Sequence, residues 1–314
     1  MSFQPTPPST DDDRSDDVPT HPACVMVFNA CDPSGAGGLT ADIATIASVG
    51  GHPVAIATGA YARDTARIYE HFCLDDEAVT EQARTVLEDV PVQVIKVGFV
   101  GSAENISAIA ELSNDYSELP LISYMPDLSW WQEDQIDQYL DAFRELLLPQ
   151  TSVLVGNHST LWRWLLPDWS SERSPSARDL AAAAAEMGVP YTLVTGIPLP
   201  DQQIENVLAS PETVLCHARF ELFDATFTGA GDTLTTALAA LLACGSDLAT
   251  ACTEALDYLD RCLDAGFRPG MGHVIPDRMF WAEPEEADNP SSDDDKDDQP
   301  SLEGYGLPSH DTKH

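Results

Sequence analysis

The sequence predicts an α/β fold, built on an open, mostly parallel sheet flanked by helices on both faces. Short apolar runs alternate with helical stretches along most of the chain, which is the pattern of repeated strand–helix–strand units. Of the 314 residues 43% are hydrophobic, which is enough to bury a sizeable core. Two glycine-rich turns open predicted helices, where the carboxyl ends of parallel strands converge on a ligand crevice.

The predicted elements follow one another in a regular order. The predicted strands share short apolar runs, at 25–28, 54–57, 94–98, 121–124, 153–155 and 191–195. The predicted helices share apolar residues at helical spacing or a high alanine content, at 39–46, 106–112, 136–148 and 178–187. Segments 203–208 and 213–219 are expected to form a late β pair, before a helix from Gly229 and another over 248–266.

The two ends of the chain differ in composition from its middle. Residues 1–22 and 283–314 are rich in proline, serine and acidic residues, a composition that cannot bury apolar surface. We therefore expect two disordered acidic tails around a single domain at 23–282.

The charge of the chain excludes some partners. The tails carry −4 and −9 of the total net charge of −37, which leaves −24 for the middle. Such a surface repels phosphate backbones and anionic lipids, so neither nucleic acid nor membrane is an expected partner. Only Lys96, Lys296 and Lys313 are lysines. A lysine-poor, acidic core favours solubility at high salt, and we interpret the chain as halophilic.

Cysteine usage and the amino terminus indicate a cytoplasmic protein. The seven cysteines are odd in number, scattered and free of any C-x-x-C pair, which argues against a disulfide framework or a zinc site. The start of the chain lacks a basic segment followed by an apolar one, and no apolar run reaches about 18 residues. We expect a soluble, cytoplasmic protein with reduced thiols.

Gly229, Ala230 and Gly231 form a small turn at the start of a long helical run. Backbone N–H groups at such a place converge on an anion at the positive end of the helix dipole. Asp232 follows at once, and a carboxylate beside an anion site suggests a base that takes a proton from an attacking hydroxyl. Phosphoryl transfer is the function that this pair suggests; the alternative is a capped surface helix after an ordinary glycine turn.

A second flexible turn, residues 31–38, follows the first strand and opens a helix that carries Asp42. It lacks both the G-x-G-x-x-G pattern of dinucleotide sites and the pattern of a P-loop. Taken alone, it is also compatible with a plain connection between a strand and a helix.

Together these two turns resemble those of the ribokinase-like superfamily, and most closely the hydroxymethylpyrimidine/phosphomethylpyrimidine kinase family of thiamine biosynthesis. The resemblance covers about residues 24–275. Further matching segments occur in the same order: 62–65, 94–101, 147–150 before a strand that ends in Asn157, and 194–196.

The resemblance implies ATP with Mg²⁺ as phosphoryl donor and a hydroxymethyl group as acceptor. By position, Asp42 and the backbone around Gly37 would hold the pyrimidine, and Arg63 and Phe99 would contact the same ring. Asp232 would be the catalytic base. The anion hole would comprise Gly229, Ala230 and Gly231. The nucleotide would be bound by Asn157, Thr195, Gly196 and Thr228. The metal ligands stay unassigned.

The chain departs from the family pattern at four positions. Thr40 and Arg63 stand where the family has glutamine, Tyr124 begins a segment that replaces Asp-Pro-Val, and Thr160 replaces a glutamate. Arginine offers only donors and prefers carboxylate or phosphate, so the acceptor could be a monophosphate. These changes either abolish or redirect the activity.

Three functions therefore stay open. The first is ATP-dependent phosphorylation of a hydroxymethylpyrimidine, of its monophosphate, or of both. The second is a non-catalytic protein that binds a pyrimidine or vitamin metabolite, and the third is a pyridoxal-type kinase. A homodimer is possible. Lys96 could touch phosphate or extend along a strand end, and Trp130 and Trp131 favour helix packing over a ring site.

Overall fold

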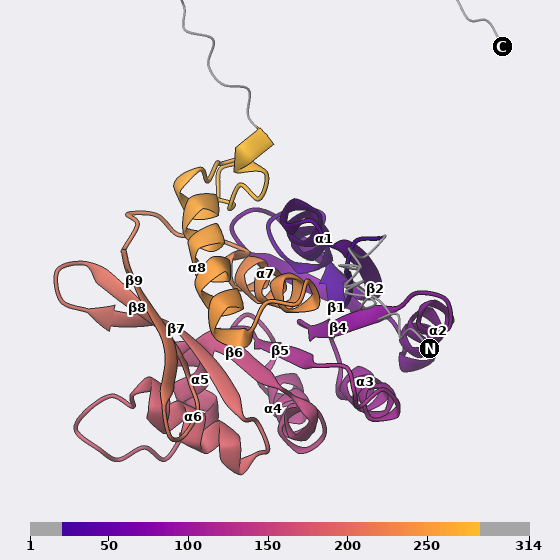
Figure 1. Ribbon diagram of the computed structural model, residues 1–314, viewed down its shortest axis with the longest axis horizontal. Coiled ribbons are helices and arrows are strands. Elements are labelled where there is room, and N and C mark those ends of the chain that lie inside the picture. The colour runs from indigo at the N-terminus through magenta and orange to yellow at the C-terminus, as the bar shows by residue number, and fades with distance from the viewer. Residues whose placement is uncertain (1–20, 283–314) are drawn as a thin grey trace, which may run out of the picture. The chain divides into compact units, whose positions relative to one another are not determined.

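The computed structural model describes residues 21–282, of which those up to Phe280 belong to one compact unit. Nine strands form one sheet in the order β3-β2-β1-β4-β5-β6-β7-β8-β9 (Figure 1). The strands are β1 Cys24–Cys31, β2 His52–Arg63, β3 Ile68–Cys73, β4 Val92–Val97, β5 Leu121–Met125, β6 Val153–Asn157, β7 Tyr191–Leu199, β8 Gln203–Ala209 and β9 Val214–Glu221.

The six inner strands, from β2 to β7, pair in parallel, and the outer strands β3, β8 and β9 pair antiparallel. The predicted open, mostly parallel sheet is confirmed, and so is the late β pair. Strand β3 was not predicted, because Ile68–Cys73 is largely exposed and lacks an apolar run.

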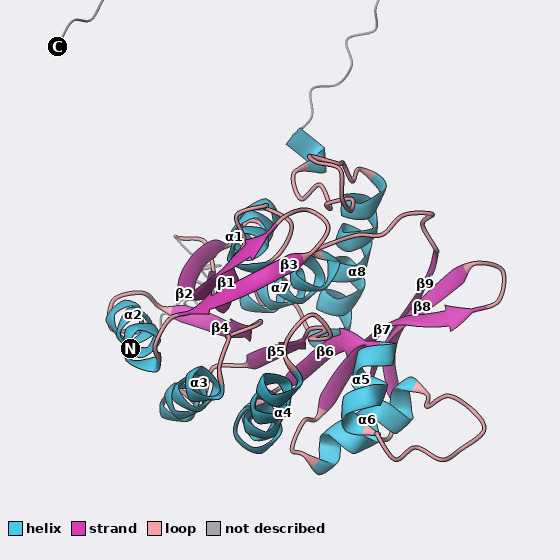
Figure 2. Ribbon diagram, turned by 180° about the vertical axis from the view of Figure 1, so that it is seen from behind, coloured by secondary structure: helices cyan, strands magenta, loops and turns pink. Residues whose placement is uncertain are grey.

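Helices cover both faces of the sheet, as expected (Figure 2). Helices α1, α7 and α8 lie on one face, and α2 to α6 lie on the other. The helices are α1 Gly38–Val49, α2 Asp76–Leu87, α3 Ala103–Asp115, α4 Glu133–Ala142, α5 His158–Leu165, α6 Ala177–Glu186, α7 Ala230–Ala243 and α8 Leu248–Asp264. A π turn, Phe143–Leu147, and the 3-10 turns Leu148–Gln150 and Phe280–Ala282 complete the elements.

The alternation of side chains along β1 shows how the sheet divides the core. Met26 and Phe28 belong to the cluster under α3, α4 and α6, whereas Val25 and Val27 belong to the cluster under α1, α7 and α8. Successive strand residues point to opposite faces, so a polar residue in register with Val27 lies under α1 and α7. This rule places the polar groups of the site.

The helix starts differ in one respect that matters for function. Side chains of Asp75, Ser102, Asn157, Ser176 and Asp247 cap α2, α3, α5, α6 and α8. Helix α7 starts after Gly229 and, within the described part of the chain, receives no such side-chain cap, so its first N–H groups are available to a ligand. Helix α1 also starts after a glycine, but its first N–H group, that of Gly38, donates to the carboxylate of Asp232.

The acidic tails predicted at 1–22 and 283–314 lie outside the described residues, except for His21 and Pro22. Among residues 21–282, no helix is both long and apolar enough to cross a membrane.

Candidate active site

Three neighbouring strands carry polar side chains to the same place. Asn29 on β1, Lys96 on β4 and Tyr124 on β5 follow apolar residues that face α1 and α7. Strand alternation therefore points all three toward the starts of these two helices. Asn29 and Lys96 are buried, with exposures of 1% and 0%.

The starts of α1 and α7 pack tightly against each other. Gly229, which precedes α7, has φ of +89°, and a Cβ atom there would collide with the carbonyl oxygen of Ala36. A Cβ atom on Gly231 would collide with the hydroxyl of Tyr124. Only glycine fits either position without displacement of a turn or a side chain, so the sequence of the turn follows from this close approach.

Arg278 links the turn after β1 to the start of α7 through its guanidinium group. Its guanidinium donates to Thr233 Oγ1 at 3.0 Å, to the carbonyl oxygen of Gly35 at 3.2 Å and to that of Ala36. The residue is only 6% exposed. Because the guanidinium presents several donors in a fixed plane, one side chain ties the turn after β1 to the start of α7.

Asp232 lies at the meeting point of these elements. Its Oδ1 accepts hydrogen bonds from Asn29 Nδ2 at 2.9 Å and from Lys96 Nζ at 3.0 Å. Its Oδ2 accepts one from the backbone N–H of Gly38 at 2.9 Å. The side chain keeps 16% exposure and lines a cavity, and Oδ2, with one donor against two on Oδ1, has more acceptor capacity left for a ligand.

Asp42 shares two hydrogen-bond donors, Asn29 and Lys96, with Asp232. Its carboxylate accepts bonds from Lys96 at 2.8 Å, Asn29 at 2.9 Å and Thr236 at 2.6 Å. Burial, together with the charge of Asp232, raises the pKa of Asp42 against the opposing effect of Lys96. For Asp232, burial is outweighed by the charge of Lys96 and by hydrogen bonds, which hold its pKa below the usual value. Two carboxylates thus share one cation.

A cavity of about 460 Å³ opens in front of Asp232. Arg63 lines it, with Nη1 3.4 Å from Asp32 Oδ2, so its charge is partly offset. His273 also lines it, and its Nδ1 is 3.0 Å from Thr228 Oγ1. The aromatic side chains in its wall are Tyr61, Tyr124, Trp130 and Phe227. The cavity suits a small ring that carries polar or anionic groups.

A smaller cavity of about 170 Å³ lies on the other side of the start of α7. Its polar part includes Asn157, Thr195 and Gly196, and its apolar part comes largely from β9 and α8. Ala230 lines this cavity, whereas Gly229, Gly231 and Asp232 line the larger one. The first turn of α7 therefore lies between two cavities, as transfer of an anionic group between two ligands requires.

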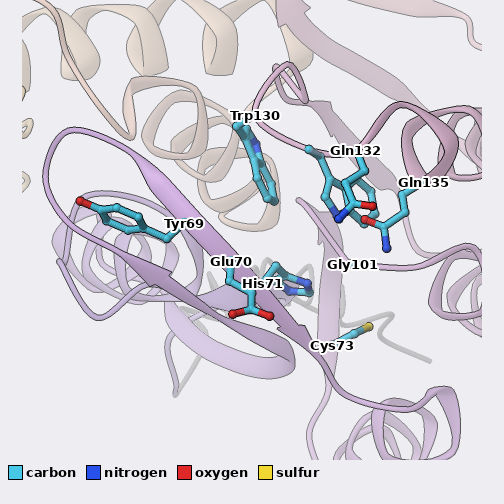
Figure 3. A pocket seen from close by; sticks show the side chains of 9 residues that line it. Tyr69, Glu70, His71, Cys73, Gly101, Trp130, Gln132 and Gln135 are labelled. Atoms are coloured by element: carbon cyan, nitrogen blue, oxygen red, sulfur yellow. The ribbon is translucent and has the colours of Figure 1, made fainter.

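A third cavity, of about 230 Å³, lies beyond Trp130. Figure 3 shows Trp130 above His71 and Cys73, with Gln132 and Gln135 beside it. Because Trp130 lines this cavity and the one in front of Asp232, its indole separates them. Trp130 also packs edge-on against Phe99 and Tyr61, so the expectation of a packing role holds only in part.

The structure does not bring all the predicted residues to a cavity. Arg63, Asp232 and the glycines of the α7 turn line the large cavity, and Asn157, Thr195 and Gly196 line the small one. Thr228 lies in the large cavity rather than with the other nucleotide candidates.

Two residues carried over as ring contacts lie away from the cavities. Asp42 is fully buried and its carboxylate is occupied by three donors, and Phe99 is 3% exposed inside an aromatic cluster. At the turn, Gly38 rather than Gly37 lines the large cavity. Lys96 takes neither of the two roles considered for it, because it is buried between carboxylates.

The sequence analysis missed Asn29, Tyr61, His273 and Arg278. Asn29 is a polar residue that ends an apolar run, which is a usable signal. His273 and Arg278 lie in a segment without periodicity, and only the fold shows that they reach the site.

The described residues contain no group of three or more His, Cys, Asp or Glu side chains arranged to hold a metal ion. This donor set does not fit a metal cage made by the protein alone. Mg²⁺ commonly binds through substrate phosphates and water with one or two carboxylates, so we assign no protein ligand to it.

An open α/β sheet, two helix starts that meet, an uncapped first turn of α7 between two cavities, and a carboxylate on that turn are together typical of a ribokinase-like small-molecule kinase. A model of the phosphomethylpyrimidine kinase family matches residues 32–277. The chain belongs to this family.

Curated relatives agree with this assignment, and solved structures share the fold. The hydroxymethylpyrimidine/phosphomethylpyrimidine kinase of Streptomyces coelicolor is 26% identical, over 84% of this chain and 97% of that protein. That of Mycobacterium tuberculosis is 28% identical, over 82% and 94%. An ADP complex of Bacillus subtilis pyridoxal kinase shares the fold with a TM-score of 0.74, at 20% identity over 83% and 98%. A last common ancestor of HMPPK and PLK/HMPPK vitamin kinases has a TM-score of 0.59, at 25% identity over 77% and 99%.

Proposed function

We propose that this protein transfers the terminal phosphoryl group of ATP to the hydroxymethyl group of a pyrimidine, or of its monophosphate, in thiamine biosynthesis. The observation that carries the proposal is the position of Asp232, which lies in the first turn of α7 and lines the larger cavity. Family membership supports the same reaction. The departures at Thr40 and Thr160 leave this arrangement intact.

The two cavities would divide the substrates between them. The smaller one, with Asn157, Thr195 and Gly196, would take the nucleotide, and the larger one would take the ring alcohol. The uncapped N–H groups of Ala230, Gly231 and Asp232 would stabilise the negative charge on the transferring phosphoryl oxygens. Mg²⁺, where present, would supply further charge neutralisation on the phosphates.

Asp232 would orient the acceptor hydroxyl and accept its proton on Oδ2 as the bond to phosphorus forms. Its Oδ1 cannot do this, because Asn29 and Lys96 occupy it. Arg63 and His273 would contact the substituents of the ring or a phosphate on it. Positioning and electrostatic stabilisation supply most of the rate in such transfers.

The test is ATP consumption with hydroxymethylpyrimidine, its monophosphate and pyridoxal as acceptors, for wild type and for Asp232→Asn. Asparagine keeps the size of the side chain and removes its basicity. Loss of a general base costs roughly 10²- to 10⁴-fold, so kcat should fall at least about 10²-fold with ATP affinity unchanged. A wild-type protein that binds ATP and turns over none of the three acceptors would favour a non-catalytic binding protein, whereas faster turnover of pyridoxal would favour the pyridoxal-type kinase.

We also propose a cytoplasmic protein, and a homodimer remains a prediction that a sedimentation experiment checks.

A further inference from the structure

Lys96 is fully buried and contacts carboxylates on two different helices. Its side chain has 0% exposure, and its ammonium group is 2.8 Å from Asp42 on α1 and 3.0 Å from Asp232 on α7. Burial of a lone ammonium group in the core disfavours its charged form, yet here the two carboxylates outweigh burial and raise the pKa of Lys96. Lys96 is therefore a buried and charged residue of strand β4.

We propose that Lys96 is a positioning residue of the phosphotransfer site, which fixes Oδ1 of Asp232 and keeps Asp232 ionised, with Asp42 as its second carboxylate partner. The inference rests on the proposed function, because it assigns Lys96 to the base of that reaction. It gives Asp42 a role in the support of the base rather than in substrate binding.

The two oxygens of Asp232 support this division of roles. Lys96 and Asn29 both donate to Oδ1, and only the N–H of Gly38 donates to Oδ2. Because Gly38 itself lines the large cavity, Oδ2 is the oxygen that an acceptor hydroxyl can reach. Lys96 lines neither the large nor the small cavity, so it cannot contact a substrate phosphate from this position.

The charges in the cluster explain why a lysine is needed. Asp42 and Asp232 both bond to the same nitrogen of Asn29, at 2.9 Å each, so their carboxylates are close neighbours. Two carboxylates this close cannot both ionise easily, and without a cation they would share a proton. The positive charge of Lys96 offsets the repulsion between the two carboxylates, which allows Asp232 to stay ionised and basic.

Other groups around Asp232 do not replace Lys96. Tyr61 and Tyr124 are neutral phenols, since burial and the charge of Asp232 raise the pKa of each. Arg278 is directed to carbonyl oxygens and Thr233, and Arg63 is paired with Asp32. Among the described residues, Lys96 is the cation in direct contact with Asp232.

The experiment is a pH–rate profile of kcat for wild type, Lys96→Met, Asp42→Asn and the double variant. Wild type should stay active down to the lowest pH at which it is folded, because its base has a lowered pKa. Lys96→Met should move the acidic limb upward by at least one pH unit, with the KM for ATP changed less than about threefold. The double variant loses the cation and one carboxylate together, so its limb should move back toward the wild-type position.

Two results would overturn the proposal. One is a Lys96→Met variant with an unchanged acidic limb and a KM for ATP raised tenfold or more, which would make Lys96 a phosphate ligand. The other is a double variant whose acidic limb lies at the same pH as that of Lys96→Met. If Lys96 had only a structural role, removal of the Asp42 charge would not compensate for its loss. Circular dichroism confirms that each variant is folded.

A second measurement separates this proposal from the proposed function. Titration of the Asp232 side-chain carbon by NMR, assigned with Asp232→Asn, requires no turnover. If wild type phosphorylates none of the acceptors, the proposed function fails, yet a higher Asp232 pKa in Lys96→Met that is reversed in the double variant still supports the charge pairing. Equal Asp232 pKa values in all of the proteins would refute the pairing even in an active enzyme.

Discussion

Replacement of Arg278 tests whether the two turns of the site depend on a single side chain. Arg278→Leu removes three hydrogen bonds and leaves the carbonyl oxygens of Gly35 and Ala36 without this donor. Each buried acceptor that loses its partner costs about 1 to 3 kcal/mol. Removal of a buried charge offsets part of this loss, so we expect a net destabilisation of about 2 to 4 kcal/mol.

The replacement should also lower kcat in the fraction of the variant that is folded. Without the guanidinium, the start of α7 and the turn after β1 can separate, and misplacement of a catalytic group by about 1 Å costs roughly 10²-fold in rate. We expect kcat of Arg278→Leu to fall at least tenfold under conditions where the variant is folded. Arg278→Lys keeps the charge but cannot span all three acceptors, so it should be intermediate.

Urea denaturation and initial rates measure the two effects separately. Arg84→Lys is the matched control, because Arg84 pairs with Asp115 on the surface, with both side chains about half exposed. Such a pair contributes at most about 1 kcal/mol. The reasoning is refuted if Arg278→Leu loses no more stability than this control and keeps its kcat.

Three further predictions concern the acceptor, acid stability and salt. Arg63→Gln should improve use of neutral hydroxymethylpyrimidine relative to its monophosphate, and an unchanged ratio of kcat/KM for the two would remove Arg63 from recognition. His71 is held neutral, with burial lowering its pKa to about 4. Since the unfolded chain takes up this proton near pH 6.5, stability should fall by up to about 3 kcal/mol as pH drops from 6.5 to 4. In His71→Gln this part of the decline, followed by urea denaturation, should be absent. Finally, the net charge of −24 on the middle of the chain is self-repulsive unless screened, so Tm should rise with KCl, and a flat or falling Tm would contradict the halophilic interpretation.

The sequence predicted the elements of the site better than the directions of its side chains. Gly229 and Gly231 are visible in the sequence as a small turn before a helical run, although the groups that exclude a Cβ atom there, on Ala36 and Tyr124, come from distant parts of the chain. The role of Asp42 could not be predicted in the same way, because the number of residues between Asp42 and the first turn does not show whether its side chain faces a ligand. In the structure it faces Lys96, and this depends on the register of β4 beside β1.

Several of the parts that escaped prediction depend on long-range contacts. Strand β3 is an exposed edge strand, held by pairing with β2 rather than by an apolar run of its own. Arg278 bonds to Gly35 across 243 positions, and Thr228 meets His273 across 45. No local pattern encodes such contacts, so a sequence without its fold gives little reason to select these residues.

The span of the Arg278 contacts bears on when the protein becomes active during synthesis. Chains are made from the amino terminus, and domains tend to begin folding in that order. The turn after β1 exists early, but the residue that fastens it to α7 leaves the ribosome only after nearly the whole domain has been made. A nascent chain that ends before Arg278 can therefore hold most of the sheet while its two turns remain unfastened. Competence for phosphotransfer should appear late and abruptly, as a property of the finished domain.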